Sequence, residues 1–363
     1  MPAPAWLPVR PELRDAEPYG APQLDVQVRL NTNENPYGPS ALVARDMATA
    51  VERVATALHR YPDREAMDLR TDLAAYLSAE TGVRLGSDSL WAANGSNEVM
   101  LQLMLAFGGP DRTAVSFAPT YSMYPEYARN SHTRWVTGRR GDDFELDLDA
   151  ALALIAAESP SLVLLTSPNH PTGTHLPSEQ IEAVLDAAPG VVVVDEAYAE
   201  FRRAGVPSAV SLLAEHRRLV VTRTMSKAFA LAGGRLGYAA AHPAVIDALR
   251  VVRLPYHLSA VTQEIARVAL WHADELLGQV ARLRDIRDQL VDDMRALGLR
   301  VPDSDANFVL FGIFPDRHAT WRALLDSGVL VRESGPPGWL RVSVGTPEET
   351  TAFLQALRKV LDR

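Results

Sequence analysis

Residues 224 to 238 carry the candidate reactive group of this chain. They read Thr224-Met225-Ser226-Lys227-Ala228-Phe229-Ala230-Leu231-Ala232-Gly233-Gly234-Arg235-Leu236-Gly237-Tyr238 and follow an apolar run. We expect that run to be a strand, so that Lys227 lies just past a strand end, where open α/β sheets bind ligands. A partly desolvated amine loses basicity there and can attack an aldehyde. A lone lysine would be a surface residue, but nearby Ser226 and Arg235, which suit a phosphate, favour a site.

The apolar run before this segment is one of several that predict a layered α/β fold. Most of these runs are apolar throughout, which is typical of strands covered on both faces in a largely parallel sheet. Helical patterns lie between them, such as Ser178–Ala187 with Ser178 as a possible N-cap. The predicted strands are Ala114–Phe117, Leu162–Thr166, Val191–Val194, Leu219–Thr222 and Tyr238–Ala241.

The last third of the chain predicts a smaller α+β domain. Residues 259–297 are strongly helical, with one apolar stripe at three- and four-residue steps and Asp274 as a possible cap. Strand-like runs follow at Asn307–Phe311 and Leu340–Val344. We therefore expect an N-terminal arm, residues 1–40, that joins the small domain, a large domain at 41–258, and the C-terminal small domain at 259–363.

Three further segments place polar side chains beside Lys227. Asp195 ends an apolar run and could pair with a pyridine nitrogen, with Tyr198 nearby, although Asp195 could equally cap a helix. Asn169 follows another run in Ser167-Pro168-Asn169-His170-Pro171-Thr172-Gly173, which could also be a plain turn. The segment Asn94-Gly95-Ser96-Asn97-Glu98 offers backbone N–H groups to a phosphate, or is an ordinary helix start with Ser96 or Asn97 as its cap.

Single aromatic and basic residues complete the set of candidates. Tyr121 is a candidate stacking partner for an aromatic cofactor, although a core tyrosine is the commoner case. Arg332 and Arg341 are embedded in apolar runs, where a guanidinium can bind a carboxylate or phosphate, or can face water from an edge strand.

Composition narrows the classes of protein. The chain has 363 residues, a net charge of −9 and no cysteine. The negative charge argues against a nucleic-acid binder, and without cysteine there is no disulfide, thiolate metal site or thiol nucleophile. We expect no metal ion. No apolar run approaches the ~20 residues that span a bilayer, and the N-terminus lacks the pattern of a signal peptide, so we expect a cytoplasmic protein without a membrane partner.

Taken in order, these segments resemble the aspartate-aminotransferase superfamily of fold type I enzymes, which use pyridoxal 5′-phosphate (PLP). Within it the chain is most similar to the histidinol-phosphate aminotransferases, and the resemblance runs from Arg10 to the final helix. The segments that carry this narrower match are Arg29–Gly38, Arg60-Tyr61-Pro62-Asp63, Gly95-Ser96-Asn97-Glu98, Tyr19-Gly20 and Leu254-Pro255-Tyr256.

The resemblance implies a role for each candidate residue. Lys227 would bind the PLP aldehyde and move the proton, with Asp195 and Tyr198 as the other catalytic residues. PLP would be held by Gly95, Ser96, Asn97, Tyr121, Asn169, Asp195, Tyr198, Thr224, Ser226, Lys227 and Arg235, and by Tyr61 from a neighbouring subunit. The substrate would meet Tyr19, Asn33, Asn97, Tyr256, Arg332 and Arg341.

The activity that the resemblance implies is the transfer of an amino group from L-histidinol phosphate to 2-oxoglutarate in histidine biosynthesis, by a ping-pong mechanism in a homodimer with shared sites. Two other enzyme activities use the same scaffold, an aromatic amino-acid aminotransferase and a threonine-phosphate decarboxylase. A third alternative is a regulatory module that senses PLP, but we find too few residues before Asn31 for the DNA-binding domain that such proteins carry.

Overall fold

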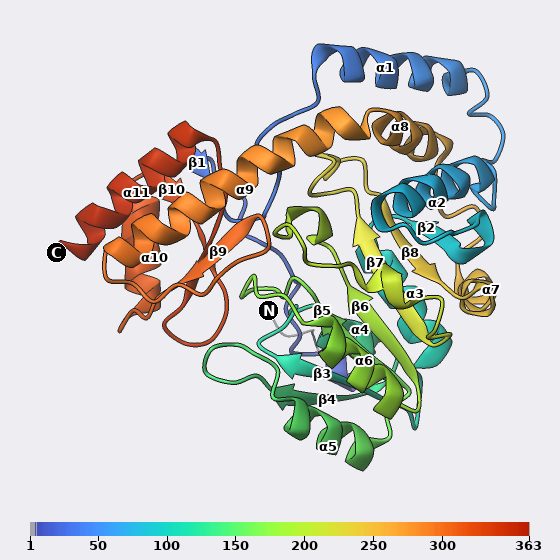
Figure 1. Ribbon diagram of the computed structural model, residues 1–363, viewed down its shortest axis with the longest axis horizontal. Coiled ribbons are helices and arrows are strands. Elements are labelled where there is room, and N and C mark those ends of the chain that lie inside the picture. Colours follow the sequence, from blue (N-terminus) through green and yellow to red (C-terminus); the bar gives the residue numbers. More distant parts are fainter. Residues whose placement is uncertain (1–3, 5, 363) are drawn as a thin grey trace.

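The computed structural model describes residue 4 and residues 6–362, and its centre is a seven-stranded sheet (Figure 1). The strand order is β2-β8-β7-β6-β5-β3-β4, and all neighbours are parallel except that β8 runs antiparallel to β2 and β7. The strands are β2 (Leu90–Ala93), β3 (Thr113–Ala118), β4 (Arg134–Arg139), β5 (Leu162–Thr166), β6 (Val191–Asp195), β7 (Leu219–Thr224) and β8 (Gly237–Ala241). The five predicted strands are confirmed as β3, β5, β6, β7 and β8.

The continuous apolar runs are explained by helices on both faces of this sheet. Along β6, Val192 and Val194 belong to one core cluster, and Val191 and Val193 belong to another. Successive side chains of a strand point to opposite faces, so both sets need apolar residues. The first cluster includes α2 (Met67–Thr81), α5 (Leu148–Glu158) and α6 (Ser178–Ala187), and the second includes α3 (Ser96–Phe107), α4 (Tyr124–Asn130) and α7 (Pro243–Val252).

The predicted helical stretch 259–297 is two helices, α8 (Ala260–Trp271) and α9 (Ala273–Ala296). The Ser259 side chain caps α8 by accepting a hydrogen bond from Thr262 N at 3.0 Å. The predicted apolar stripe has seven residues. Five of them are buried and two, Ile286 and Leu297, are partly buried; the buried ones are Leu276, Val280, Leu283, Leu290 and Met294. Helix α8 also packs on α1 (Ala41–Ala55), which lies at the outer edge in Figure 1.

Two predicted caps are wrong. Helix α6 begins with Ser178 itself, Pro177 is its N-cap, and no side chain caps it. Helix α9 begins at Ala273, so Asp274 lies within its first turn and not before it. Pro177 has a ψ of 143°, so the helical backbone begins one residue later, and His272 is both the C-cap of α8 and the N-cap of α9.

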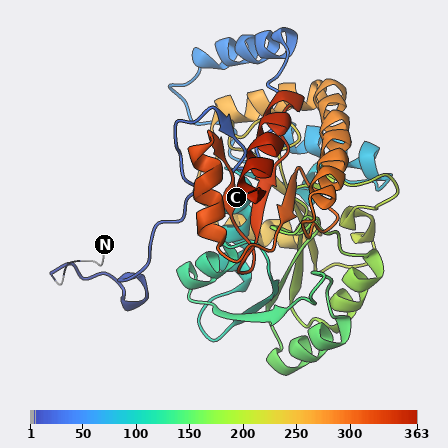
Figure 2. The same cartoon turned by 90° about the vertical axis from the view of Figure 1, so that its left-hand side faces the viewer.

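Two smaller sheets complete the fold beside the end of α9. The strand β1 (Val28–Arg29) pairs in parallel with β10 (Val329–Leu330), and β12 (Leu340–Ser343) lies between β9 (Phe308–Phe311) and β11 (Arg332–Glu333). The helices α10 (Arg317–Asp326) and α11 (Pro347–Leu361) cover them, whereas the N-terminal segment extends away from this body in Figure 2.

We propose that the chain divides as the sequence predicts, into an arm at 1–40, a large domain at 41–258 and a small domain at 259–363. Helix α9 connects the large domain to the small one. Leu276, Val280 and Leu283 pack in the core of the large sheet, whereas Leu290 and Met294 pack with β1, β9 and α11. One helix therefore belongs to both cores. No helix in the described part of the chain is long and apolar enough to cross a membrane.

Candidate active site

A cavity of about 500 Å³ lies at the carboxyl ends of β5, β6 and β7, where the small sheet faces the large one. Most of the predicted site residues line it, and each of the three strand ends contributes side chains. Those that line it are Tyr19, Asn33, Ser96, Asn97, Tyr121, Asp195, Tyr198, Thr224, Ser226, Lys227, Arg235, Arg332 and Arg341. Of the other predicted residues, Gly95, Asn169, Tyr61 and Tyr256 do not line it.

Lys227 is the amine of this cavity. It lies three residues beyond β7, and its Nζ donates a hydrogen bond to Thr32 O at 2.9 Å. Burial, together with the positive charges of Arg341 and Arg235, lowers the pKa of Lys227 to about 8. Compared with an ordinary lysine, a larger fraction of this amine is therefore unprotonated and nucleophilic near neutral pH.

Asp195 is the carboxylate of the cavity, at the last position of β6. Its Oδ2 accepts from Tyr124 Oη at 2.9 Å, and its Oδ1 accepts from Thr222 Oγ1 and Ala197 N, both at 3.2 Å. Burial raises the pKa of Asp195 to about 6, and these hydrogen bonds oppose that rise. Asp195 therefore does not cap a helix through its side chain, because its acceptors are turned to this network.

A phosphate-sized cradle forms where α3 begins. Gly95 is the N-cap of α3 with φ of 86°, and no side chain caps the helix, contrary to the alternative in which Ser96 or Asn97 does so. A Cβ on Gly237 would lie 2.0 Å from Ser96 N, so β8 approaches the helix start as closely as its backbone allows. Arg235 closes the cradle, since a Cβ on Gly95 would lie 2.5 Å from its Nη2.

Two hydroxyls of the cradle come from the last residue of β7 and from the loop after it. Thr224 Oγ1 donates to Ser226 Oγ at 3.0 Å, and Arg235 Nη1 lies 3.4 Å from the same Ser226 oxygen. These groups join backbone N–H groups at the helix N-terminus, which is a favourable arrangement for a phosphate.

Tyr198 and Asn33 meet on the side of the small sheet. Asn33 Nδ2 donates to Tyr198 Oη at 3.0 Å, and burial raises the pKa of Tyr198 to about 12. Asn169 lies behind the cavity, where its Nδ2 already donates to Pro119 O and Thr172 Oγ1, and its buried Oδ1 has no partner in the described residues.

The cationic end of the cavity is built by two neighbouring strands. Arg332 of β11 and Arg341 of β12 are directly opposite each other in the antiparallel register. Arg341 is 4% exposed and donates to Asn31 O at 2.7 Å and to His170 Nε2, and Arg332 donates to Gly20 O at 3.0 Å. Neither forms a salt bridge with a carboxylate of the described chain. Like charges at opposed positions destabilise a sheet, so this pair favours a bound anion.

Tyr61 and Tyr256 lie together but outside this cavity. Their rings stack with centroids 4.3 Å apart, and the two residues are 79% and 41% exposed. Tyr256 therefore does not reach the cavity of its own chain, and neither does Tyr61, which was expected in the site of a neighbouring subunit.

Several residues of this region were not predicted from the sequence, and four of them contact the predicted ones or lie among them. His170, Arg317 and Thr166 line the cavity, and Tyr124 contacts Asp195. The available signals were weak: His170 stands inside the quoted Asn-His-Pro-Thr-Gly motif, and Tyr124 follows Tyr121 by three residues. Burial lowers the pKa of His170 well below its ordinary value, together with the charge of Arg341, so His170 is a neutral acceptor here.

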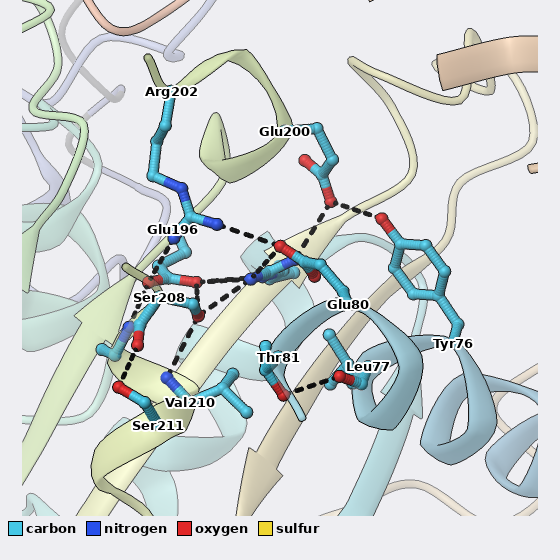
Figure 3. Close-up of polar contacts among 12 residues, drawn as sticks. Tyr76, Leu77, Glu80, Thr81, Glu196, Glu200, Arg202, Ser208, Val210 and Ser211 are labelled. Atoms are coloured by element: carbon cyan, nitrogen blue, oxygen red, sulfur yellow. Dashed lines mark hydrogen bonds and ion pairs between the residues drawn. The ribbon is translucent and has the colours of Figure 1, made fainter. Parts of the chain in front are cut away.

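A buried cluster of ion pairs (Figure 3) lies on the face of the large sheet that is opposite the cavity. Arg223 lies between Thr222 and Thr224 on β7 and, because side chains alternate, points away from the cavity. Its guanidinium binds Glu196 at 2.9 Å, and also Glu80 and Glu200. Although burial opposes ionisation, Arg223 and Arg202 hold the pKa of Glu196 below its ordinary value.

The residues fit the cofactor that the resemblance implied. PLP needs an amine for its aldehyde, a carboxylate for its ring nitrogen and a cradle for its phosphate, and the cavity brings these three together in Lys227, Asp195 and the start of α3. The Oδ1 atom of Asn169, which is buried and has no hydrogen-bond partner in the described residues, lies behind this cavity.

The comparisons with known proteins agree with this geometry. A family model described as aminotransferase class I and II matches residues 25–357. Histidinol-phosphate aminotransferase 3 of Burkholderia lata is 59% identical over 355 residues, which are 98% of this chain and 96% of that protein. The histidinol-phosphate aminotransferase of Thermobifida fusca is 60% identical over 351 residues, which are 97% and 95% of the two chains.

Among solved structures, that of the histidinol-phosphate aminotransferase from Sinorhizobium meliloti in complex with pyridoxal-5′-phosphate is similar, with a TM-score of 0.82. It is 25% identical and the match covers 93% of this chain and 91% of that one. The fold is therefore the predicted fold type I. From its fold, its cavity and these relatives, the chain belongs to the class I and II aminotransferases and, among them, to the histidinol-phosphate aminotransferase family.

Proposed function

We propose that this chain is the PLP-dependent transaminase that converts L-histidinol phosphate and 2-oxoglutarate to imidazole-acetol phosphate and L-glutamate in histidine biosynthesis. The observation that carries the proposal is the pairing of Arg332 and Arg341 across β11 and β12, beside Lys227. The two half-reactions share one lysine, so the anionic ends of both substrates must fall in one region. A guanidinium fork binds phosphate and carboxylate alike.

Each side chain has a role in this reaction. When bound, PLP supplies an electron sink for the carbanion formed at the substrate Cα. Lys227 holds the cofactor and then moves the proton between Cα and C4′. Asp195 would pair with the ring nitrogen, Tyr121 would lie against the ring, and Tyr198 would bind the ring oxygen. Asn169 would donate to the same oxygen if its Nδ2 exchanged one of its two present acceptors, Pro119 O and Thr172 Oγ1. The phosphate of PLP is held by Gly95, Ser96, Asn97, Thr224, Ser226 and Arg235, and substrate is met by Tyr19, Asn33, Asn97, Tyr256, Arg332 and Arg341.

We further propose a cytoplasmic homodimer in which Tyr61 completes the neighbouring site. Its exposure of 79% and its position outside the cavity of its own chain support this assignment. Tyr256 stacks on Tyr61, so it would act in the neighbouring site together with it.

The role of Lys227 is tested by borohydride reduction of the holoenzyme and peptide mapping. The chain has two lysines, Lys227 and Lys359, so the alternatives are few. The pyridoxyl group should be found on Lys227, and a label on Lys359 alone would refute the assignment.

The choice of substrate is tested by a panel of amines with 2-oxoglutarate: histidinol phosphate, phenylalanine, tyrosine and threonine phosphate. Histidinol phosphate should give the highest kcat/KM. Faster turnover of an aromatic amino acid, or carbon dioxide released from threonine phosphate, would replace the proposal by one of the other two activities.

A further inference from the structure

The carboxylate of Asp195 is fixed by different donors on its two oxygens. Oδ1 accepts from Thr222 Oγ1 and Ala197 N, which belong to β7 and to the residues just after β6. Oδ2 accepts from Tyr124 Oη at 2.9 Å, and no other donor reaches this oxygen within the described residues. Within the described residues, Oδ1 is therefore held by two donors and Oδ2 by the Tyr124 hydroxyl alone.

That hydroxyl is itself held in place. Tyr124 is the first residue of α4, it is fully buried, and its Oη lies 2.8 Å from Thr166 Oγ1. A tyrosine has a single hydroxyl proton, so while Tyr124 donates to Asp195, Thr166 must be the donor to Tyr124. Thr166 Oγ1 lies in turn 3.3 Å from Thr120 Oγ1, which extends the chain of hydroxyls.

The ring of Tyr124 contacts a second site residue. It meets Tyr121 edge to face, with centroids 5.5 Å apart and an interplanar angle of 86°. One buried side chain therefore touches both the carboxylate proposed for the ring nitrogen and the tyrosine proposed for the ring face.

The surroundings of Asp195 make this hydrogen bond important for its charge. Burial raises the pKa of Asp195, and the bond from Tyr124 is the first of the contacts that lower it again. The other titratable groups facing it, none of which donates a hydrogen bond to it, are Glu196, Tyr121, Tyr127 and Tyr198. A neutral Asp195 would be a poor partner for a pyridinium nitrogen.

We propose that Tyr124 is a positioning residue that orients the Asp195 carboxylate and keeps it ionised, so that the cofactor nitrogen stays protonated. The proposal rests on the role assigned to Asp195. It assigns Tyr124 no contact with substrate and no part in proton transfer at Cα.

The test is Tyr124→Phe reconstituted with ¹⁵N-labelled PLP. The ¹⁵N chemical shift of the ring nitrogen, followed against pH, reports its protonation directly. The pH midpoint of this titration should fall by roughly one unit or more, since a hydrogen bond to a charged acceptor is lost. At neutral pH kcat should fall about tenfold, while KM for histidinol phosphate should stay within about twofold.

Two further variants guard against a merely structural effect. Tyr127→Phe is the matched control, because Tyr127 is buried on the same helix and its hydroxyl has no hydrogen-bond partner in the described residues. Its titration should match that of the unmodified enzyme. Thr166→Val leaves Tyr124 in place but removes its donor, and should shift the midpoint in the same direction by less.

Asp195→Asn separates the two assignments. If this variant keeps a protonated ring nitrogen, the role of Asp195 is wrong. If it loses the proton while Tyr124→Phe titrates as Tyr127→Phe does, Asp195 keeps its role and the proposal for Tyr124 is overturned.

Discussion

Lys227 is chemically distinct from Lys359, the other lysine of the chain, because it is buried and lies near two arginines. Burial and the charges of Arg341 and Arg235 favour its neutral form, whereas Lys359 is exposed on α11. A lysine whose pKa is lowered gains reactivity as pH rises through the lowered value, not through the ordinary one. This distinction can be measured without cofactor.

In the apoenzyme, we predict that trace acetylation of Lys227 rises with a midpoint near pH 8. Arg341→Gln should move this midpoint to higher pH, because removing a nearby positive charge stabilises the ammonium form. Peptide mapping gives the rate at each pH, with Lys359 as internal reference. An unchanged midpoint in Arg341→Gln would show that the charge of Arg341 does not contribute to the lowered pKa.

Arg341→Ala should impair both half-reactions. Phosphate and carboxylate are expected to use the same guanidinium, so the loss should be ~1.5–3 kcal/mol in each, or about tenfold to a hundredfold. Single-turnover kinetics with histidinol phosphate and, separately, with glutamate measure it. A defect confined to glutamate would require a separate phosphate site and contradict the shared-anion assignment.

How far the site was predictable depends on whether a residue's neighbours are near in sequence. Lys227 and Asp195 could be predicted because each follows its own apolar strand. The contacts of Tyr124 with Asp195 and of His170 with Arg341 join residues 71 and 171 positions apart, and no local pattern marks them. Similarly, both arginines were named in advance, but their opposition across β11 and β12 depends on a register that the sequence does not reveal.

At the scale of elements, the close approach of β8 to α3 is the contact that forms the cradle. Gly237 has room for no side chain, because a Cβ would meet backbone atoms of Gly95 and Ser96, which cannot rotate away. A methyl group at position 237 would therefore force β8 away from the start of α3.

We predict that Gly237→Ala weakens PLP binding at least tenfold and lowers the melting temperature of the holoenzyme more than that of the apoenzyme. The physical reason is that a bound ligand stabilises the folded state by an amount that rises with the logarithm of its concentration divided by its Kd, so weaker binding of PLP lowers the stability of the holoenzyme alone. Gly233→Ala is the control, because a Cβ there meets nothing within 4 Å. Equal losses in apoenzyme and holoenzyme would mean that the substitution damages the sheet and not the cradle.

Five strands of the central sheet were predicted, β2 and β4 of the same sheet were not, and the remaining errors lie at the ends of elements. The apolar runs identified strands within one or two residues, because burial on both faces leaves a continuous signal. Ser178 and Asp274 were plausible caps by residue type, but a helix start is decided by the backbone before it, and Pro177 and the end of α8 decided both.

At the scale of the whole molecule, we predict that Tyr61 completes the site of a neighbouring subunit, since it stacks on Tyr256 outside the cavity of its own chain. Mixing inactive Lys227→Ala and inactive Tyr61→Ala subunits should restore activity, up to about a quarter of the unmodified level if the subunits exchange at random. In a mixed dimer one site receives both defects and the other receives neither.

The measurement is turnover after subunit exchange in mild denaturant, with each variant exchanged against itself as the control. If mixing restores nothing although mixed dimers form, Tyr61 serves the site of its own chain. Sedimentation at high dilution adds a second check, since a fully active monomer would contradict a shared site.

The pairing of β1 with β10 also has a consequence for biosynthesis of the chain. Val28 lies opposite Val329, so the first strand to leave the ribosome waits for a partner made about 300 residues later. At ~5–20 residues per second, that wait is about 15 s to a minute. The phosphate cradle at the start of α3 also forms late, because β2, which precedes α3, pairs with the later strand β8. PLP therefore cannot help the early nascent chain to fold, and chaperones that shield exposed apolar segments should matter most during this interval.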